Sequence, residues 1–243
     1  DDAWKKKYEE PEAPDTSKLP SLPEGWCWTT IAEVSDCLDS MRVPINKAER
    51  LGRQGTVPYY GANGQVGWID TPLFDEPLVL VVEDETFTGR TKPFSYLING
   101  PAWVNNHAHV LRATDAILPS FLNVALSFYP FTPLTTGTTG RRKLTQRAMN
   151  GAPIALPPLS EQQRIVDLVD MHVSEMDSAE ETAVVSERRC ARLRQSVLKW
   201  AFEGKLVDQD PNDEPAEELL ARIRAERAAA PTTKTRGRKA KSS

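Results

Sequence analysis

The residues best suited to chemistry lie in a segment rich in cations and hydroxyl groups. Residues 134–147 contain five threonines, two glycines and four cations, and no acid. Cations neutralise DNA phosphates, hydroxyls hydrogen-bond phosphate oxygens, and arginine can bind guanine O6 and N7. We therefore predict an exposed loop that ends in a short polar turn or helix. A basic loop that contacts only solvent is the alternative. The predicted DNA contacts are Thr136, Thr138, Thr139, Arg141, Arg142 and Lys143.

Two further segments are candidates for DNA contact. Residues 59–65, YYGANGQ, contain a tight-turn signal, and the side chains of Asn63 and Gln65 can bind adenine bidentately. A hairpin turn that sets strand register explains the same residues equally well. Residues 86–92, TFTGRTK, form a second positive loop that has the same two interpretations. The predicted contacts here are Tyr60, Asn63, Gln65, Arg90 and Lys92.

Metal ligands and catalytic carboxylates are less well supported. His107 and His109 would project from one face of a strand, but no carboxylate or cysteine is nearby in sequence, so we expect a structural role. Glu83, Asp84 and Glu85 lack the following lysine pattern of a nuclease. The sequence contains neither a P-loop nor a methyltransferase cofactor motif. We predict no catalytic residue, no metal site and no cofactor bound by this chain.

Composition indicates a soluble globular protein with no membrane association. The chain has 243 residues, 40% of them hydrophobic, and a formal net charge of −4. No apolar run approaches the roughly 20 residues that cross a bilayer, and we expect no signal peptide. Three cysteines without CxxC spacing favour a reduced compartment, so we predict a cytoplasmic, prokaryotic location. The net charge hides local segregation, because the tail at 231–243 is basic throughout.

One long helix is the dominant predicted element, within residues 156–207. Pro157 and Pro158 exclude a helix before Ser160, which has capping-box spacing to Gln163, and Gly204 marks the end. About 43 residues would then form a rod of roughly 65 Å. A compact domain cannot cover such a rod, so we favour a coiled-coil arm over a surface helix packed on its own domain. Alternating steps of four and three define its seam, with predicted partner contacts at Ile165, Val169, Met176, Leu193, Val197 and Trp200.

The remaining pattern predicts an α/β (α+β) globular domain with a mixed sheet. Residues 26–38 indicate a short strand followed by a helical turn, residues 78–82 a buried strand, and residues 107–111 another strand. Residues 118–128 predict a helix and residues 154–156 a last strand, and residues 215–230 predict a return helix that can fold beside the arm. The expected boundaries are 1–19 linker or preceding-helix remnant, 20–153 globular domain, 154–207 long helix, 208–230 turn and return helix, and 231–243 disordered basic tail.

Five segments in this order resemble the DNA-specificity (S) subunit of type I restriction-modification systems. They are YYGANGQVGWID at 59–70, WVNNHAHVLR at 103–112, TTGTTGRRKLTQ at 135–146, IALPPLSEQQRIV at 154–166 and LRQSVLKWAFEGKLV at 193–207. The resemblance covers about residues 20–230. It implies a target-recognition domain that reads one half of a bipartite double-stranded DNA site, and a spacer helix that binds the modification (methyltransferase) subunit.

The resemblance also implies that the chemistry belongs to partners. S-adenosylmethionine would be used by the modification subunit, and ATP and Mg²⁺ by the restriction (translocase/nuclease) subunit. Only one recognition domain and one helix match, and the chain begins at Asp1, so we expect a C-terminal half or a half-length subunit, with the second recognition half in cis or in a homodimer. The competing hypothesis is a coiled-coil scaffold whose globular head binds protein. Clustering of the cations of residues 88–92 and 135–147 on one face favours DNA, and scattering favours the scaffold.

Overall fold

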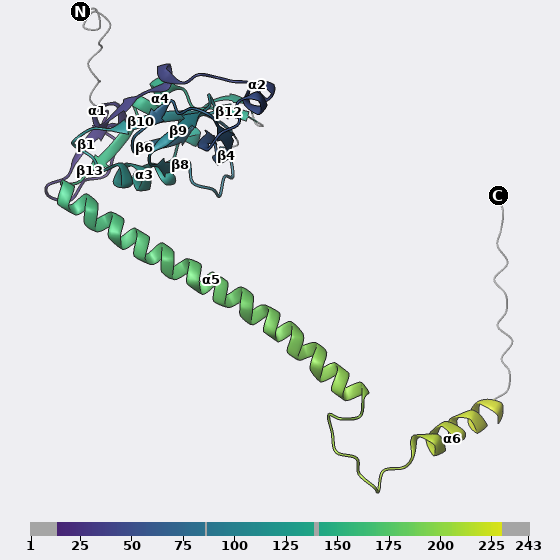
Figure 1. Cartoon of the computed structure of the whole chain (residues 1–243). Coiled ribbons are helices and arrows are strands. Elements are labelled where there is room, and N and C mark those ends of the chain that lie inside the picture. Colours follow the sequence, from purple (N-terminus) through teal and green to yellow (C-terminus); the bar gives the residue numbers. More distant parts are fainter. Residues whose placement is uncertain (1–13, 86, 139–140, 230–243) are drawn as a thin grey trace, which may run out of the picture. The chain divides into compact units, whose positions relative to one another are not determined.

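The structure is a computed structural model and describes residues 14–85, 87–138 and 141–229. Contacts divide the described chain into two compact units, with the boundary between Glu175 and Met176. Every strand in the described residues belongs to the first unit, together with helices α1 to α4 (Figure 1). This arrangement confirms the predicted α/β domain followed by a long helix and a short C-terminal helix.

A four-stranded antiparallel sheet lies at the centre of the first unit, with strand order β2-β10-β6-β8. Strand β6, Leu78–Val82, is a continuous apolar run in which every residue is buried, which is typical of a strand covered on both faces. The other members are β2 (Ser35–Cys37), β8 (Ser95–Ile98) and β10 (Ala108–Ala113). The predicted strand at 78–82 is confirmed, and the strand predicted at 107–111 is shifted slightly towards the C-terminus.

A second four-stranded sheet, with order β4-β3-β9-β5, is mixed. Strand β3 (Val57–Gly61) pairs in parallel with β9 (Pro101–Val104) and antiparallel with β4 (Gly64–Ile69), and β5 is Phe74–Asp75. Ala62 and Asn63 form the two-residue turn of the β3–β4 hairpin, and Gly64 has a φ of 113°, which favours glycine. The tight-turn prediction is therefore confirmed.

Helices cover the central sheet and connect it to a small terminal ribbon. Helix α3 (Pro119–Ser127) begins with the predicted proline and buries Leu122 and Leu126 in the main core. Strand β1 (Cys27–Thr30) pairs with β13 (Pro153–Leu156), and helix α1 (Ile31–Val34) follows β1 directly, as the pattern at 26–38 predicts. The short helices are the 3-10 turns Asp39–Met41 and Thr132–Leu134 and the α-helices α2 (Lys47–Gly52) and α4 (Gln146–Asn150).

The prediction of an exposed loop at 134–147 is wrong, because the chain forms a hairpin there. Strand β11 (Thr136–Thr138) pairs with β12 (Arg141–Lys143), and β12 pairs with β7 (Asp84–Glu85). Leu144 is fully buried in the main core, and Thr135 is buried at the other end. Leu144, with Leu134 packed against the same core, thus anchors a segment whose overall composition is too polar to form a core. The expected short helix after it is α4.

Helix α5, Leu159–Phe202, begins one residue before the predicted cap. The amides of Glu161 and Gln162 both donate to the Pro158 carbonyl, so Pro158 and not Ser160 occupies the cap position. Gln162 is fully buried, and its side chain accepts from the Leu118 amide at 2.8 Å. It also donates to the carbonyls of Ala116 at 3.1 Å and Pro157 at 2.9 Å. This glutamine fixes the first turn of α5 to the start of α3.

The end of α5 confirms the predicted glycine stop. Gly204 has a φ of 68°, its amide donates to Ala201, and the Lys205 amide donates to Trp200, which is the Schellman pattern. Helix α6, Ala216–Ala229, follows and buries none of its side chains. Among the described residues, no helix is both long enough and apolar enough to span a membrane.

Candidate nucleic-acid interface

Two of the loops predicted to contact DNA touch each other. Arg90 Nη2 donates a 2.7 Å hydrogen bond to Asn63 Oδ1, and the guanidinium also donates to backbone oxygens of its own loop. Asn63 lies in the β3–β4 turn, and Arg90 and the exposed Lys92 lie in the loop after β7. Gln65 is exposed and donates to the Gly67 carbonyl at 3.1 Å. The turn and the loop are therefore neighbours, although 27 residues separate their contacting side chains.

The β11–β12 hairpin is joined to the same loop through β7. Arg142 pairs in register with Glu85, and Lys143 with Asp84, immediately before the loop that carries Arg90. We call the turn 62–65, the loop 87–92 and the hairpin 135–143 together the predicted DNA surface. In Figure 1, β4 and β12 lie at one end of the first unit, and β1 and β13 lie at the other, where α5 begins. The two basic segments therefore lie in neighbouring parts of the first unit.

Two cations of the hairpin, Arg142 and Lys143, already have partners within the chain. Arg142 Nε donates to Thr135 Oγ1 at 2.6 Å, and its Nη2 donates to the Thr135 carbonyl at 3.0 Å. Lys143 Nζ lies 2.9 Å from Glu83 Oε1, and this hydrogen bond raises the pKa of Lys143 above its ordinary value. The Lys143 side chain is nevertheless 59% exposed, so a phosphate can approach it while it pairs with Glu83.

The other predicted contacts have different surroundings. Thr136 is exposed, and its hydroxyl lies 3.4 Å from the Lys143 carbonyl. Tyr60 is half-buried in β3, with its ring centroid 6.0 Å from that of Tyr96. Thr139 lies outside the described residues, and the side chains of Thr138 and Arg141 are likewise not described. Direct contact with DNA stays a prediction for every one of these residues.

A buried ionic network lies beneath the hairpin and was not predicted from the sequence. Arg42 Nη1 is 2.6 Å from Glu83 Oε2, and Arg42 Nη2 is 3.2 Å from Asp39 Oδ2. His109 Nδ1 is 2.5 Å from Asp39 Oδ2, and Glu83 continues the network to Lys143. Burial opposes the charge of Asp39, but the hydrogen bond from His109 and the nearby cations outweigh it and lower the pKa of Asp39. The pKa of Glu83 is lowered in the same way, because the hydrogen bonds from Arg42 and Lys143 outweigh burial.

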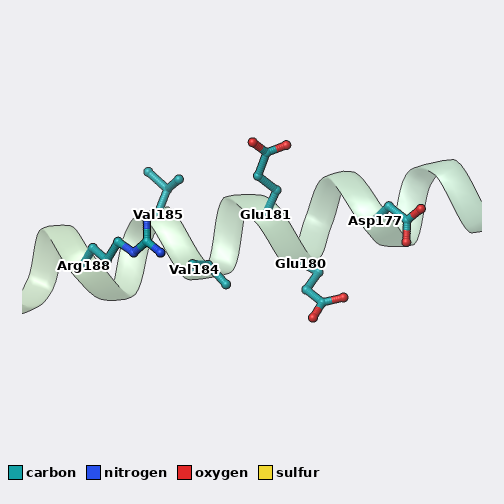
Figure 2. A pocket seen from close by; sticks show the side chains of 6 residues that line it. All are labelled: Asp177, Glu180, Glu181, Val184, Val185 and Arg188. Atoms are coloured by element: carbon teal, nitrogen blue, oxygen red, sulfur yellow. The ribbon is translucent and has the colours of Figure 1, made fainter. Parts of the chain in front are cut away.

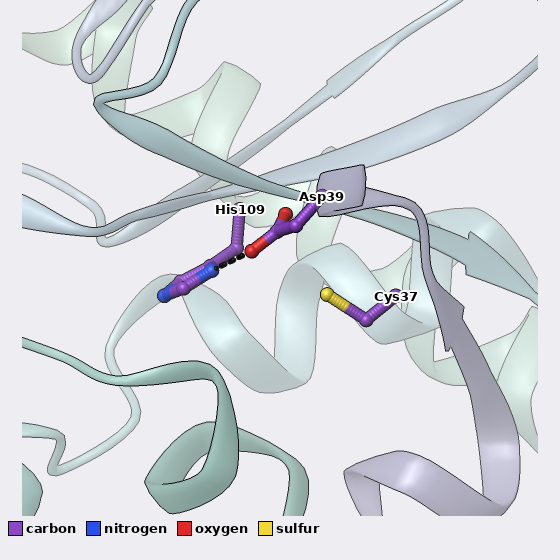
Figure 3. Close-up of side chains that lie close together, drawn as sticks. All are labelled: Cys37, Asp39 and His109. Atoms are coloured by element: carbon purple, nitrogen blue, oxygen red, sulfur yellow. Dashed lines mark hydrogen bonds and ion pairs between the residues drawn. The ribbon is translucent and has the colours of Figure 1, made fainter. Parts of the chain in front are cut away.

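Figure 3 shows a grouping of Cys37, Asp39 and His109 whose ligand atoms all lie within 4.8 Å of one another. The chemistry of the donors does not favour a metal ion. Both nitrogens of His109 already face protein oxygens, and both oxygens of Asp39 accept hydrogen bonds. Burial, reinforced by the Asp39 charge, raises the pKa of Cys37 to about 12, so its thiol keeps its proton. The grouping is a hydrogen-bonded support for the fold.

The predicted partner contacts on α5 separate into two classes. Ile165 packs against the main core of the first unit, so the chain itself covers this residue. Val169 is half-buried, and the remaining four are exposed, namely Met176, Leu193, Val197 and Trp200. A shallow hollow farther along the helix is lined by Asp177, Glu180, Glu181, Val184, Val185 and Arg188. All six come from one helix, and Glu180 and Glu181 point to opposite sides in Figure 2, so the hollow does not enclose a ligand.

Helix α2 and its C-cap residue supply two arginines, Arg50 and Arg53, that the sequence reasoning did not single out. The Arg50 guanidinium lies 4.7 Å from the ring centroid of Tyr59, and that of Arg53 lies 4.5 Å from the ring of Trp103. Arg53 also pairs with Asp70 at 2.7 Å. These stacking contacts fix α2 beside the mixed sheet. The signal for the helix was present at Asn46, whose side chain accepts from the amide three residues later.

The fold and the candidate surface agree with a known family. A family model described as type I restriction modification DNA specificity domain matches residues 23–184. The chain belongs to this family. The matched range contains the whole strand-bearing part of the specificity domain and the first half of α5.

Proteins with similar sequences are described as specificity subunits of type I restriction enzymes. The chain is 31% identical over 143 residues to the putative type I restriction enzyme specificity subunit S.HindORF215P of Haemophilus influenzae, covering 59% of this chain and 36% of that protein. It is 26% identical over 302 residues to the type I restriction enzyme EcoAI specificity subunit of Escherichia coli, covering 92% of this chain and 48% of that protein. The chain thus spans half or less of the length of these relatives.

Solved structures support the fold. A chain from a structure described as the structural basis of complex assembly and conformational transition of the type I R-M system matches with a TM-score of 0.61 and 23% identity, over 78% of this chain and 49% of that chain. The HsdS subunit from Thermoanaerobacter tengcongensis matches with a TM-score of 0.51 and 21% identity, over 78% of this chain and 48% of that one.

Proposed function

We propose that this chain is the DNA-recognition part of a type I restriction-modification complex and reads one half of a bipartite target. The observation that carries the proposal is the clustering of the predicted DNA surface. The 2.7 Å bond from Arg90 to Asn63 and the pairing of β12 with β7 bring three separate segments together. Cations supply affinity for phosphates, while amides and arginine supply base readout in the major groove. The specificity-subunit names of the relatives support this function.

The exposed apolar side chains of α5 support a second role, which is docking of the modification subunit. Met176, Leu193, Val197 and Trp200 are each about half exposed or more, although they are apolar and belong to the seam of alternating four- and three-residue steps. Burying this stripe in a helix pair would remove the apolar area from water. The restriction subunit would then join the complex formed by the chain and the modification subunit.

The chain is proposed to direct chemistry without performing it. The sequence lacks a nucleotide-binding or methyltransferase motif, and the carboxylates of Asp39 and Glu83 are committed to ion pairs. Methyl transfer from S-adenosylmethionine would take place in the modification subunit. ATP and Mg²⁺ would be used by the restriction subunit. A cytoplasmic location remains a prediction.

A second recognition half is required to read a bipartite site, either in cis or in a homodimer. The relatives are about twice as long as the matched regions, which supports this requirement. Size-exclusion chromatography with light scattering, on the chain alone and with its modification subunit, separates the two arrangements. A homodimer with two methyltransferases indicates a half-length subunit, and a monomer with one indicates that the second half lies in cis.

The test of DNA recognition is methylation by the complex with the modification subunit. Changing Arg141, Arg142 and Lys143 together to alanine is expected to abolish methylation of target DNA. The matched control changes Arg222, Arg224 and Arg227 to alanine, which removes the same charge from exposed positions on α6. Normal methylation by the hairpin variant would contradict the proposal.

A further inference from the structure

The base of the β11–β12 hairpin rests on a buried histidine. His109, in β10, is 2% exposed, and its Nε2 lies 2.9 Å from the carbonyl oxygen of Leu144. Leu144 directly follows Arg142 and Lys143, and its amide donates to the Glu83 carbonyl at 2.8 Å. The other ring nitrogen, Nδ1, lies 2.5 Å from Asp39 Oδ2. His109 therefore connects the end of the hairpin to the 3-10 turn at Asp39.

Both partners of the ring are acceptors, and this determines its charge. A carbonyl oxygen cannot donate a hydrogen bond, and the lowered pKa of Asp39 keeps that carboxylate ionised and equally unable to donate. A neutral imidazole has one N–H and one lone pair, so it can satisfy only one of the two oxygens. The imidazolium form donates to both. The geometry thus requires a proton on each nitrogen for both bonds to form.

The charged groups around the ring keep their charge near neutral pH. Asp39 and Glu83, the latter 4.0 Å from Nδ1, both have lowered pKa values and stay ionised. Lys143, beyond Glu83, has a raised pKa and stays protonated, and Arg42 bridges the two carboxylates. Cys37, the remaining neighbour, is a neutral thiol with a pKa of about 12. Two ionised carboxylates therefore face Nδ1 and balance the charge of the imidazolium form.

We propose that His109 is a positioning residue for the DNA contacts of the hairpin, and that its imidazolium form holds the Leu144 carbonyl and thereby fixes Arg142 and Lys143. A side chain at this position that does not donate to the Leu144 oxygen leaves the hairpin without the hydrogen bond at its buried end. The contact between His109 and the hairpin does not depend on the proposed function; only its predicted effect on DNA binding does.

The first test measures hairpin order without DNA. In the full chain, hydrogen exchange of the Leu144 amide, corrected for the intrinsic rate, is compared between the wild type and His109→Gln at one pH. Protection is expected to fall about tenfold in His109→Gln, in keeping with the loss of one charge-assisted hydrogen bond. His107→Gln is the matched control, because His107 pairs with Asp84 at 2.6 Å, and it is expected to keep the wild-type protection. Protection that is unchanged in His109→Gln overturns the proposal.

A second measurement keeps the proposal testable if His109→Gln does not fold. The chain has three histidines, so the variant His107→Gln/His172→Gln retains His109 as the only one. Nitrogen NMR of this ring at about pH 6 is expected to report a proton on both nitrogens. A single N–H with one unprotonated ring nitrogen overturns the assignment.

A DNA-binding measurement distinguishes failure of this inference from failure of the proposed function. Binding of the wild type, His109→Gln and His107→Gln to a duplex of about 30 base pairs is measured at the same pH and at fixed salt. Affinity is expected to fall with Leu144 protection in His109→Gln and to stay at the wild-type value in the His107→Gln control. If protection follows His109 but affinity does not, the hairpin does not bind DNA, and the proposed function is overturned while the positioning by His109 stands.

Discussion

Arg90 donates a 2.7 Å hydrogen bond to the side chain of Asn63, and this contact joins two loops that are 27 residues apart. The bond orients the Asn63 amide beside a guanidinium at the rim of the predicted DNA surface. An amide held by a cation is better ordered than an amide that rotates freely in solvent, and ordering before binding reduces the entropy lost in a complex. Changing this pair therefore tests whether the β3–β4 turn contacts DNA or only connects two strands.

Replacing Asn63 with alanine tests that distinction. Asn63 has a negative φ, so alanine fits the turn, and thermal stability is expected to change by less than about 0.5 kcal/mol. If Asn63 reads a base, affinity for the target duplex falls by about 1–3 kcal/mol. Fluorescence anisotropy on target and scrambled duplexes measures the loss, which is expected on the target alone. An equal loss on both duplexes would assign Asn63 to general affinity and not to readout.

The buried Gln162 is expected to control the stability of the first turn of α5. Gln162→Leu leaves the Leu118 amide and the carbonyls of Ala116 and Pro157 without their partner, at a cost of about 2–4 kcal/mol. Gln163→Leu is the control, because Gln163 is exposed and bonds only to Asp167 in the same helix. Urea unfolding of both variants gives the comparison. Equal stability of the two variants would show that the buried bonds contribute little.

Glu83 is expected to make the first unit sensitive to acid. Its pKa in the folded chain is lowered from 4.5, so below about pH 4.5 the unfolded chain binds more protons and stability falls as the pH falls. Glu83→Gln removes this contribution and leaves Arg42 with Asp39 alone, at a cost of about 3 kcal/mol near pH 7. Urea unfolding at several pH values is expected to give a shallower acid slope for the variant. An unchanged slope would assign the acid sensitivity to other carboxylates.

The exposed stripe on α5 predicts a partner interface. Leu193→Asp/Val197→Asp places two charges in the expected helix pair and is expected to abolish association with the modification subunit. Both residues are about half exposed in the chain alone, so the circular dichroism of the free protein should be unchanged. Sedimentation velocity with Arg194→Asp, an exposed neighbour on α5, provides the comparison. Association that survives the double change would move the interface elsewhere.

Local patterns predict the elements whose causes are local. The apolar run of β6, the proline at the start of α3 and the glycine after α5 each determine a structure within a few residues. The support of the hairpin depends on interactions that no local pattern encodes. Asp39, 70 residues before His109, supplies the carboxylate that is absent from the sequence around this histidine. Leu144 gives no signal for a related reason, because a single apolar residue in a polar segment has no periodicity.

The central claim is that the hairpin binds DNA, and salt-dependent binding tests it most directly. The affinity of the chain for its target duplex is measured across a series of salt concentrations, for the wild type, for Arg141→Ala/Arg142→Ala/Lys143→Ala and for the α6 control Arg222→Ala/Arg224→Ala/Arg227→Ala. Steep salt dependence is expected in the wild type and in the control. The hairpin variant is expected to bind more weakly, with a slope reduced by about three, because each cation that neutralises a phosphate adds roughly one to the slope. A hairpin variant with the wild-type slope and affinity would contradict the claim that the hairpin binds DNA.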